Sequence, residues 1–262
     1  MNGGVGFSPS KETAYIAVTC ALLLGGQFVF SFVAGVEIVT LILVCFSSVF
    51  GARRGVILAA SFSVSRCIVF GFTPAVLVLY LIYYPALAAI FGGLGHFQNS
   101  AFGKAAFAIV VNLLLISLML ACSLSYALNL IKVSRIYKVT ADVLLWIIFS
   151  LCAVLLAAFD VLFISAKFFK RQNGALLKVV AFAAIAAVCT ICFTLLDDVI
   201  SPLFYGMNGV SALAYFYASF TAMLPQTVCA IVTVATLFLP VTKVLSRFSA
   251  KHSLYDKVRK PQ

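Results

Sequence analysis

The chain has 262 residues, of which 64% are hydrophobic and only 10% are charged. Soluble globular domains carry roughly 45–50% apolar and about 25% charged residues, so this composition excludes an ordinary soluble protein. The net charge of +11 does not indicate nucleic acid as a partner, because the lysines and arginines lie at the ends of apolar runs, as in proteins that contact membrane lipid.

Long apolar runs recur along the chain and predict an all-α fold, a polytopic transmembrane helix bundle. The runs cover residues 13–33, 37–51, 54–71, 74–95, 105–130, 140–166, 174–199 and 211–242. We expect six to eight spans, since the second and third runs are short and segments 74–95 and 105–140 leave the count open. Pro85 interrupts the fourth run, which makes this run the first candidate for a re-entrant segment.

The basic residues predict the orientation of the spans in the membrane. With the N-terminus in the cytoplasm, fourteen lysines and arginines lie on the inner side, and only Lys132, Arg135 and Lys138 lie on the outer side. Both termini are therefore expected in the cytoplasm, with residues 1–242 as one transmembrane helical domain and residues 243–262 as a basic tail. No signal-peptide cleavage pattern follows the first run, so this run is expected to be retained as a helix.

Motifs of membrane enzymes are absent from the sequence. It contains no H-E-x-x-H, no Gly-x-Ser-x-Gly and no G-x-x-x-x-G-K-[ST], which disfavours a membrane hydrolase and an ATPase. The eight cysteines all lie inside apolar runs, including Cys189 and Cys192 of a C-x-x-C, where they are expected to pack as small apolar residues. We therefore expect no enzyme, no catalytic residue, no metal site and no cofactor.

Arg66 is the clearest functional candidate among the ionisable residues, since a charge inside a span costs roughly 2.5–3.5 kcal/mol on insertion scales. It lies about twelve residues beyond Arg54, on the order of 18 Å from the inner end and thus toward the outer leaflet. It could bind an anionic ligand group, or it could form a structural pair with an acid such as Glu37. Asp160 is expected to pair with a basic residue near the inner surface, such as Lys167.

Aromatic and polar residues also gather toward the predicted outer side. Tyr80, Tyr83 and Tyr84 share one helical face. The last outer loop and the start of the eighth run contribute Asp197, Asp198, Tyr205, Asn208, Tyr215 and Tyr217. An aromatic belt at the membrane interface would explain this distribution. A cavity open to the outside and lined by aromatic and a few polar groups explains it too, and we favour the cavity.

The first run carries a ridge of small residues, formed by Ala17, Ala21 and Gly25 at intervals of four. Such ridges allow helices to approach closely in lipid, where van der Waals packing drives association. The ridge could serve packing within the protein, or it could dock against a second membrane protein.

Three features resemble the substrate-binding S component of energy-coupling factor transporters. They are the A-x-x-x-A of Ala17 and Ala21, the Gly-basic-Gly turn FGARRG at residues 50–55, and the closing segment YFYASFTAMLPQTVCAIVTVATLFLPVTKVL. The resemblance covers about the first 95 and the last 55 residues. In that family, a small helical membrane protein captures a vitamin or similar micronutrient from outside, and then docks through alanines of its first helix onto a shared membrane subunit driven by two ATPases.

The resemblance implies a location in a bacterial cytoplasmic membrane. It also implies site residues, because the ligands of that family lie in the outer loops and the outer halves of the helices. The implied solute ligands are Glu37, Arg66, Tyr80, Tyr84 and Asp197, and the implied docking surface is Ala17, Ala21 and Gly25. The expected function is therefore solute capture for uptake, with membrane lipid, a coupling subunit and ATPases as partners.

Two other functions stay open at this point. A self-sufficient secondary transporter or channel would need coupling residues at the midplane and often shows inverted repeats. A scaffold or regulatory membrane protein would bind no small solute. The charge of the solute is open as well, because the outer acids favour a cation whereas Arg66 favours an anion.

Overall fold

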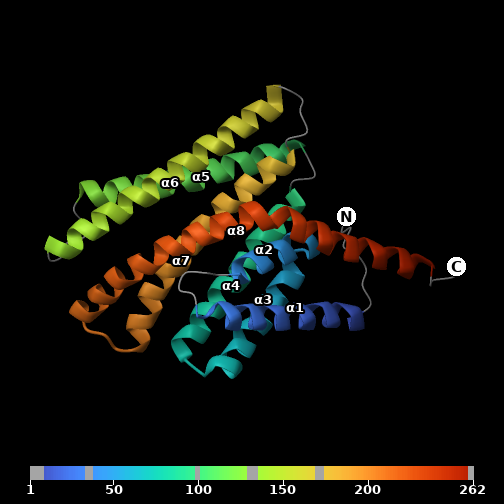
Figure 1. The fold of residues 1–262 in the computed structure, drawn as a ribbon, viewed down its shortest axis with the longest axis horizontal. Coiled ribbons are helices and arrows are strands. Elements are labelled where there is room, and N and C mark those ends of the chain that lie inside the picture. The colour runs from blue at the N-terminus through green and yellow to red at the C-terminus, as the bar shows by residue number, and fades with distance from the viewer. Residues whose placement is uncertain (1–8, 33–37, 98–100, 129–134, 169–173, 259–262) are drawn as a thin grey trace. The chain divides into compact units, whose positions relative to one another are not determined.

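The computed structural model describes residues 9–32, 38–97, 101–128, 135–168 and 174–258, and their regular structure is entirely α-helical (Figure 1). Each helix overlaps one of the predicted runs, which confirms the expected all-α fold. In chain order the helices are α1 (Pro9–Phe30), α2 (Val39–Phe50), α3 (Ala52–Phe70), α4 (Pro74–Phe97), α5 (Ala101–Ala127), α6 (Arg135–Phe168), α7 (Gly174–Phe204) and α8 (Gly209–Val258).

Six of the described helices, α1 and α4 to α8, are long and apolar enough to cross a membrane. A helix can cross the hydrocarbon core because every backbone polar group of its interior is paired within the segment. The chain is therefore a multi-pass membrane protein, as its composition predicts.

The shortest of the described helices is α2, in the second run, which was predicted to be short. With 12 residues, α2 extends over about 18 Å, well short of the roughly 30 Å hydrocarbon core. Helix α4 is continuous through Pro85 and is long and apolar enough to cross a membrane, so the fourth run is not broken at this proline. Proline removes one backbone hydrogen bond but is tolerated in membrane helices, where neighbouring groups compensate for the loss.

Two helices extend beyond the ends predicted from hydropathy. Helix α7 continues to Phe204, past residue 199, so that Asp197 and Asp198 lie inside a helix rather than in the outer loop. Helix α8 continues to Val258, past residue 242. Hydropathy marks where apolar side chains stop, whereas backbone hydrogen bonding can continue through polar residues.

The helices form two compact units. The first unit holds α1 to α4 together with α8 from Thr236 onward, and the second holds α5 to α7 together with α8 up to Ala235. In the first unit α2 packs against α4, α3 and α1, and ten of its twelve residues are buried. Helix α2 is therefore the core element of this unit, and α1 covers α3 and α2 from one side.

Glycines allow the α2–α3 turn to pack tightly against α4. Gly51 forms the turn with φ +90°, a backbone conformation that favours glycine. A Cβ on Gly92 of α4 would lie 2.8 Å from the carbonyl carbon of Gly51 and still closer to the backbone of Ala52. One turn further along α4, a Cβ on Gly95 would lie 2.6 Å from the carbonyl oxygen of Ser48. The turn thus packs backbone to backbone on this glycine surface.

The same end of the first unit carries an ion pair between α1 and α3. The Nε of Arg54 lies 3.3 Å from Oε1 of Glu12, and its second guanidinium nitrogen lies 3.5 Å from Oε2. The start of α1 therefore lies beside the start of α3, as it should if both helices begin on one side of the membrane.

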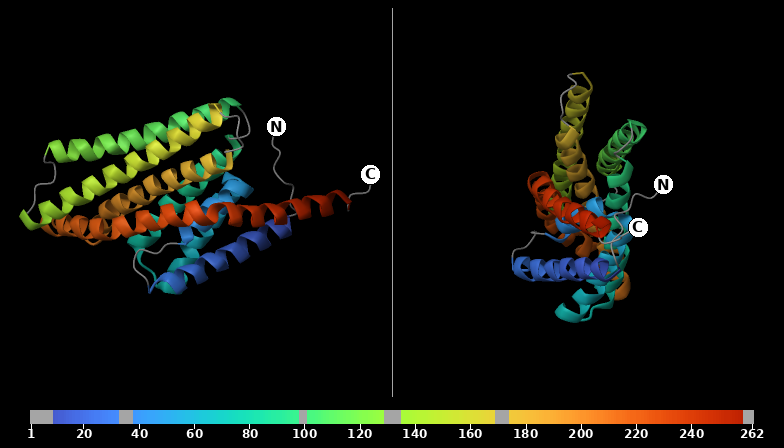
Figure 2. Two further views of the ribbon diagram at one scale, coloured as in Figure 1. Left: turned by 45° about the horizontal axis from the view of Figure 1, so that its top comes forward. Right: turned by 90° about the vertical axis from the view of Figure 1, so that its right-hand side faces the viewer.

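In the second unit, α5, α6 and α7 pack against one another in all three pairs. Helices α5 and α6 form a long antiparallel pair, with α7 and the first half of α8 beside them (Figure 2). A short turn at residues 205–208 joins α7 to α8, with Gly206 at φ +60°. Asn208 caps α8 by accepting a hydrogen bond from the backbone N–H of Ser211 at 2.8 Å.

Candidate functional site

The first unit brings Arg66 and Tyr80 together, two of the residues expected to bind solute. The guanidinium carbon of Arg66 lies 5.0 Å from the centre of the Tyr80 ring and 5.6 Å from that of Phe70. Gln27 of α1 donates a hydrogen bond of 3.4 Å to the Tyr80 hydroxyl. These side chains come from α1, α3 and α4. The charge of Arg66 is thus stabilised by aromatic rings within its own unit.

Tyr84 lies deeper in the same unit, in an aromatic cluster. Its ring is 4.8 Å from that of Tyr80, 5.1 Å from that of Tyr83 and 5.5 Å from that of Phe62, centre to centre, with steeply inclined planes. Its side chain is only 1% exposed. The cluster joins α3 to α4 and holds the Tyr80 ring against the Arg66 guanidinium group. Glu37 lies outside the residues that the structure describes.

The second unit contains Asp197, which holds α7 to α8. One carboxylate oxygen of Asp197 accepts a hydrogen bond of 2.6 Å from the Ser201 hydroxyl, one turn further along α7. The other oxygen accepts a hydrogen bond of 2.8 Å from the Tyr215 hydroxyl on α8. Asp197 lies seven residues before the end of α7 and Tyr215 six residues after the start of α8, so the short turn places them opposite each other.

A small polar cavity lies beside this contact, between α7 and α8. Its volume is about 200 Å³. The polar side chains that line it are those of Thr194, Asp197, Tyr215, Ser219 and Gln226. Carboxylate, amide and hydroxyl groups therefore converge on a space within the membrane-spanning part of the chain, where polar groups are costly unless they are paired.

Asp198 adds a second carboxylate next to Asp197. Both of its oxygens are shielded from solvent, and among the described residues neither has a hydrogen-bond partner of good geometry, although Ser219 of α8 lies nearby. A buried carboxylate without a partner carries a desolvation penalty. The two carboxylates interact electrostatically, but only Asp197 lines the polar cavity. A cation or a hydrogen-bond donor in the cavity would therefore be stabilised at Asp197, with the charge of Asp198 nearby.

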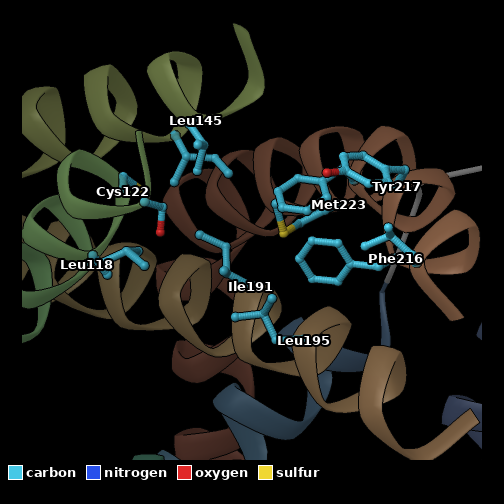
Figure 3. Close-up of a pocket in the computed structure, with 13 residues that line it drawn as sticks. Leu118, Cys122, Leu145, Ile191, Leu195, Phe216, Tyr217 and Met223 are labelled. Atoms are coloured by element: carbon cyan, nitrogen blue, oxygen red, sulfur yellow. The ribbon is translucent and has the colours of Figure 1, made fainter. Parts of the chain in front are cut away.

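A larger, apolar cavity lies on the other face of the α7–α8 pair, and Figure 3 shows its lining. Its volume is about 330 Å³, and it is lined by α5, α6, α7 and α8, mostly with aliphatic and aromatic side chains. Leu118, Leu145, Ile191 and Phe216 each come from a different helix and point toward the common space (Figure 3).

The positions of Tyr215 and Tyr217 explain why two cavities flank one helix pair. Residues two apart lie on opposite sides of a helix, so Tyr215 lines the polar cavity while Tyr217 lines the apolar one. From the sequence alone the two tyrosines form one group at the start of the eighth run, and Ser201, Thr194 and Gln226 are not predicted as site residues. The four-residue interval between Asp197 and Ser201 is the signal that could have revealed Ser201.

The small-residue ridge of α1 points away from the rest of its unit. Ala17, Ala21 and Gly25 are exposed, whereas Cys20 and Leu23 on the other face of α1 are buried. A Cβ on Gly25 would meet no atom within 4 Å, while a Cβ on the adjacent Gly26 would lie 2.8 Å from the Ile38 side chain. Packing inside the first unit therefore involves Gly26 and leaves the ridge open.

Comparison with models of known protein families, with curated proteins and with solved structures finds no match to the chain.

Proposed function

We propose that the chain is the solute-binding membrane component of an uptake system and that it captures a small cationic micronutrient at Asp197. The observation that carries this proposal is the polar cavity between α7 and α8, lined by Asp197, Tyr215 and Gln226. The cavity lies near the last residues of α7 and the first residues of α8. The distribution of basic residues predicts that this turn faces the outer side of the membrane. A solute could then enter from outside.

Charge favours a cation over an anion at this site. Asp197 uses one lone pair of each oxygen for Ser201 and Tyr215, and carboxylate oxygens can accept further hydrogen bonds. Asp198 offers two more oxygens without a partner of good geometry among the described residues. An ammonium or guanidinium group of the solute would donate to the Asp197 oxygens in the cavity, and its charge would offset the repulsion between the two carboxylates. Arg66 lies against the Tyr80 and Phe70 rings, and its Nε has no hydrogen-bond partner among the described residues. Arg66 does not line the polar cavity.

The energy for uptake would come from partners, as in the energy-coupling factor transporters that the sequence resembles. The exposed ridge of Ala17, Ala21 and Gly25 supports this part of the proposal, because a flat, small-residue surface permits close approach by a helix of a coupling subunit. Two ATPases bound to that subunit would drive release of the solute in a bacterial cell. Liposomes that contain this chain alone should then accumulate no solute, whereas accumulation would favour a self-sufficient transporter.

Thermal unfolding of the purified protein in mild detergent tests solute binding. Methylammonium, guanidinium and choline serve as cationic probes, with urea as a neutral and acetate as an anionic control. A ligand at one hundred times its Kd stabilises the folded state by about 2.7 kcal/mol, which raises Tm by several degrees for a chain of this size. At least one cationic probe should give this shift, and urea and acetate should not.

The matched variants are Asp197→Asn and Asp160→Asn, which make the same chemical change on α7 and α6 respectively. Asp160 does not line the polar cavity. The cation-dependent shift should disappear in Asp197→Asn and persist in Asp160→Asn. A shift of equal size with acetate, or its survival in Asp197→Asn, would contradict the proposal.

A further inference from the structure

The positive charge of Arg66 has no acidic partner among the side chains that the structure describes in the first unit. Glu12 is the one acid of this unit whose side chain is described, and it pairs with Arg54 at the start of α3. Arg66 lies twelve residues further along α3, about 18 Å away along the helix axis. A charge inside a membrane helix is costly unless a counter-charge or polar groups stabilise it. An anion bound at Arg66 would supply that counter-charge.

Two polar atoms flank the Tyr80 ring without hydrogen-bond partners among the described residues. One is the Nε of Arg66, which is shielded from solvent and belongs to the guanidinium group whose carbon lies 5.0 Å from the ring centre. The other is the Oε1 of Gln27, whose amide nitrogen donates a hydrogen bond of 3.4 Å to the Tyr80 hydroxyl. Buried polar groups of this kind are stabilised by a ligand that provides the missing partner. A ligand that suits both atoms carries an anionic acceptor and an O–H or N–H donor.

Arg66, Gln27 and Tyr80 lie near helix ends on one side of the first unit. Arg66 is four residues before the end of α3, Gln27 is three residues before the end of α1, and Tyr80 is six residues after the start of α4. Four residues correspond to about 6 Å along a helix. The side chains of Arg66 and Gln27 are only half-buried, so a ligand can reach them from this end. The distribution of basic residues predicts that this end faces the outer side of the membrane.

An exposed apolar surface adjoins Arg66. The Phe70 ring, 5.6 Å from the Arg66 guanidinium carbon, packs against the Phe28 ring of α1 at 6.2 Å between centres. Phe28 is 57% exposed, and Val69, which precedes Phe70 on α3, is 60% exposed. Large apolar side chains on the outside of a membrane protein face the acyl chains of lipid. A lipid with an anionic headgroup at Arg66 would therefore find apolar surface for its chains beside Phe28 and Val69.

We propose that Arg66 binds a phosphate group and that a hydroxyl of the same ligand donates to Gln27. The guanidinium group suits phosphate because its planar set of N–H donors matches two phosphate oxygens at once. The headgroup of phosphatidylglycerol carries both a phosphate and hydroxyls, and inorganic phosphate at neutral pH carries both an oxyanion and an O–H. Acetate offers no donor for Gln27 and should bind far more weakly. This site belongs to the first unit and does not rest on solute capture at Asp197.

Thermal unfolding of the full chain in mild detergent, at constant ionic strength, tests phosphate binding. The probes are inorganic phosphate, phosphatidylglycerol, and a galactosyl diacylglycerol that has the same acyl chains but no phosphate. A ligand at one hundred times its Kd should raise Tm by about 5–11 °C. A shift with both phosphate-containing probes shows that the phosphate group suffices, and a shift with phosphatidylglycerol alone identifies a lipid headgroup as its source. The galactolipid should give neither shift.

Substitutions on α3 test whether Arg66 is responsible for the shift. Arg66→Gln removes the charge and should abolish the shift, measured against the Tm of the same variant without probe. Arg66→Lys keeps the charge without the planar set of donors and should show a smaller shift. Arg53→Gln makes the same chemical change as Arg66→Gln on an exposed residue about 20 Å away along α3 and should keep the full shift.

Two results would overturn phosphate binding at Arg66. One is an unmodified chain whose Tm rises no more with inorganic phosphate or phosphatidylglycerol than with the galactolipid. The other is a shift that survives in Arg66→Gln, or that Arg53→Gln loses to the same extent.

Discussion

Replacing Gly92 with alanine tests the packing on which the first unit depends. The new Cβ would lie 2.8 Å from the carbonyl carbon of Gly51 and closer still to the backbone of Ala52, and real Cβ atoms essentially never approach within 3.0 Å of other heavy atoms. Both neighbours are main-chain atoms, so no side-chain rotation relieves the clash. The α2–α3 turn must therefore move away from α4.

Gly93 provides the control because it is the next residue of the same helix. A Cβ on Gly93 would meet no atom within 4 Å. Both substitutions gain about 0.8–1 kcal/mol of helix propensity, but only Gly92→Ala overpacks the interior, at a cost of about 1–3 kcal/mol. The two variants should thus differ by about 1–3 kcal/mol, or about 2–12 °C in Tm at 2–4 °C per kcal/mol.

The assay is thermal unfolding in mild detergent, followed by the loss of monodisperse protein in size-exclusion chromatography. Gly92→Ala should unfold at a lower temperature than Gly93→Ala, and Gly93→Ala should match or exceed the unmodified chain. If both variants unfold at the same temperature, the close approach of the α2–α3 turn to α4 is refuted.

Three further predictions concern charge, docking and topology. Tyr80→Leu should lower stability by at least about 0.5–2 kcal/mol, because Arg66 keeps its charge but loses the ring that lies 5.0 Å from its guanidinium carbon, and unchanged unfolding would argue against that contact. Ala21→Trp should abolish co-purification of a coupling subunit while Leu22→Trp, beside it on α1, should preserve it; equal recovery would exclude the ridge as the docking surface. Asn208→Cys should react with a membrane-impermeant maleimide added outside intact cells, and reaction only after lysis would reverse the predicted orientation.

The positions of the helices could be predicted from the sequence because the apolar runs are long and well separated. Helix α4 differs from this pattern, because Pro85 suggested a break in the fourth run, whereas the structure has one continuous helix there. The end of α7 was missed for a different reason. Asp197 and Asp198 end the apolar run, yet the Asp197 side chain is paired with Ser201 and Tyr215, so the helix can continue.

The two cavities could not be predicted because they depend on which faces of distant helices meet. Asp197 was recognised as polar and outward-lying, but its contact with Tyr215 requires the register of the α7–α8 turn. The apolar cavity involves ordinary leucines and phenylalanines such as Leu145 and Phe220, which carry no local signal. Likewise, the sequence does not tell which face of α1 packs inside the unit. The structure shows that Leu23 lies on the buried face and that the ridge lies on the exposed face.

Native mass spectrometry of the protein, purified gently from its own host, tests solute capture at Asp197 most directly. The unmodified chain should carry a small cationic molecule, and Asp197→Asn should have lost it while Asp160→Asn retains it. If the unmodified chain carries no such molecule, or if Asp197→Asn retains the same one to the same extent, capture of a cation between α7 and α8 is contradicted.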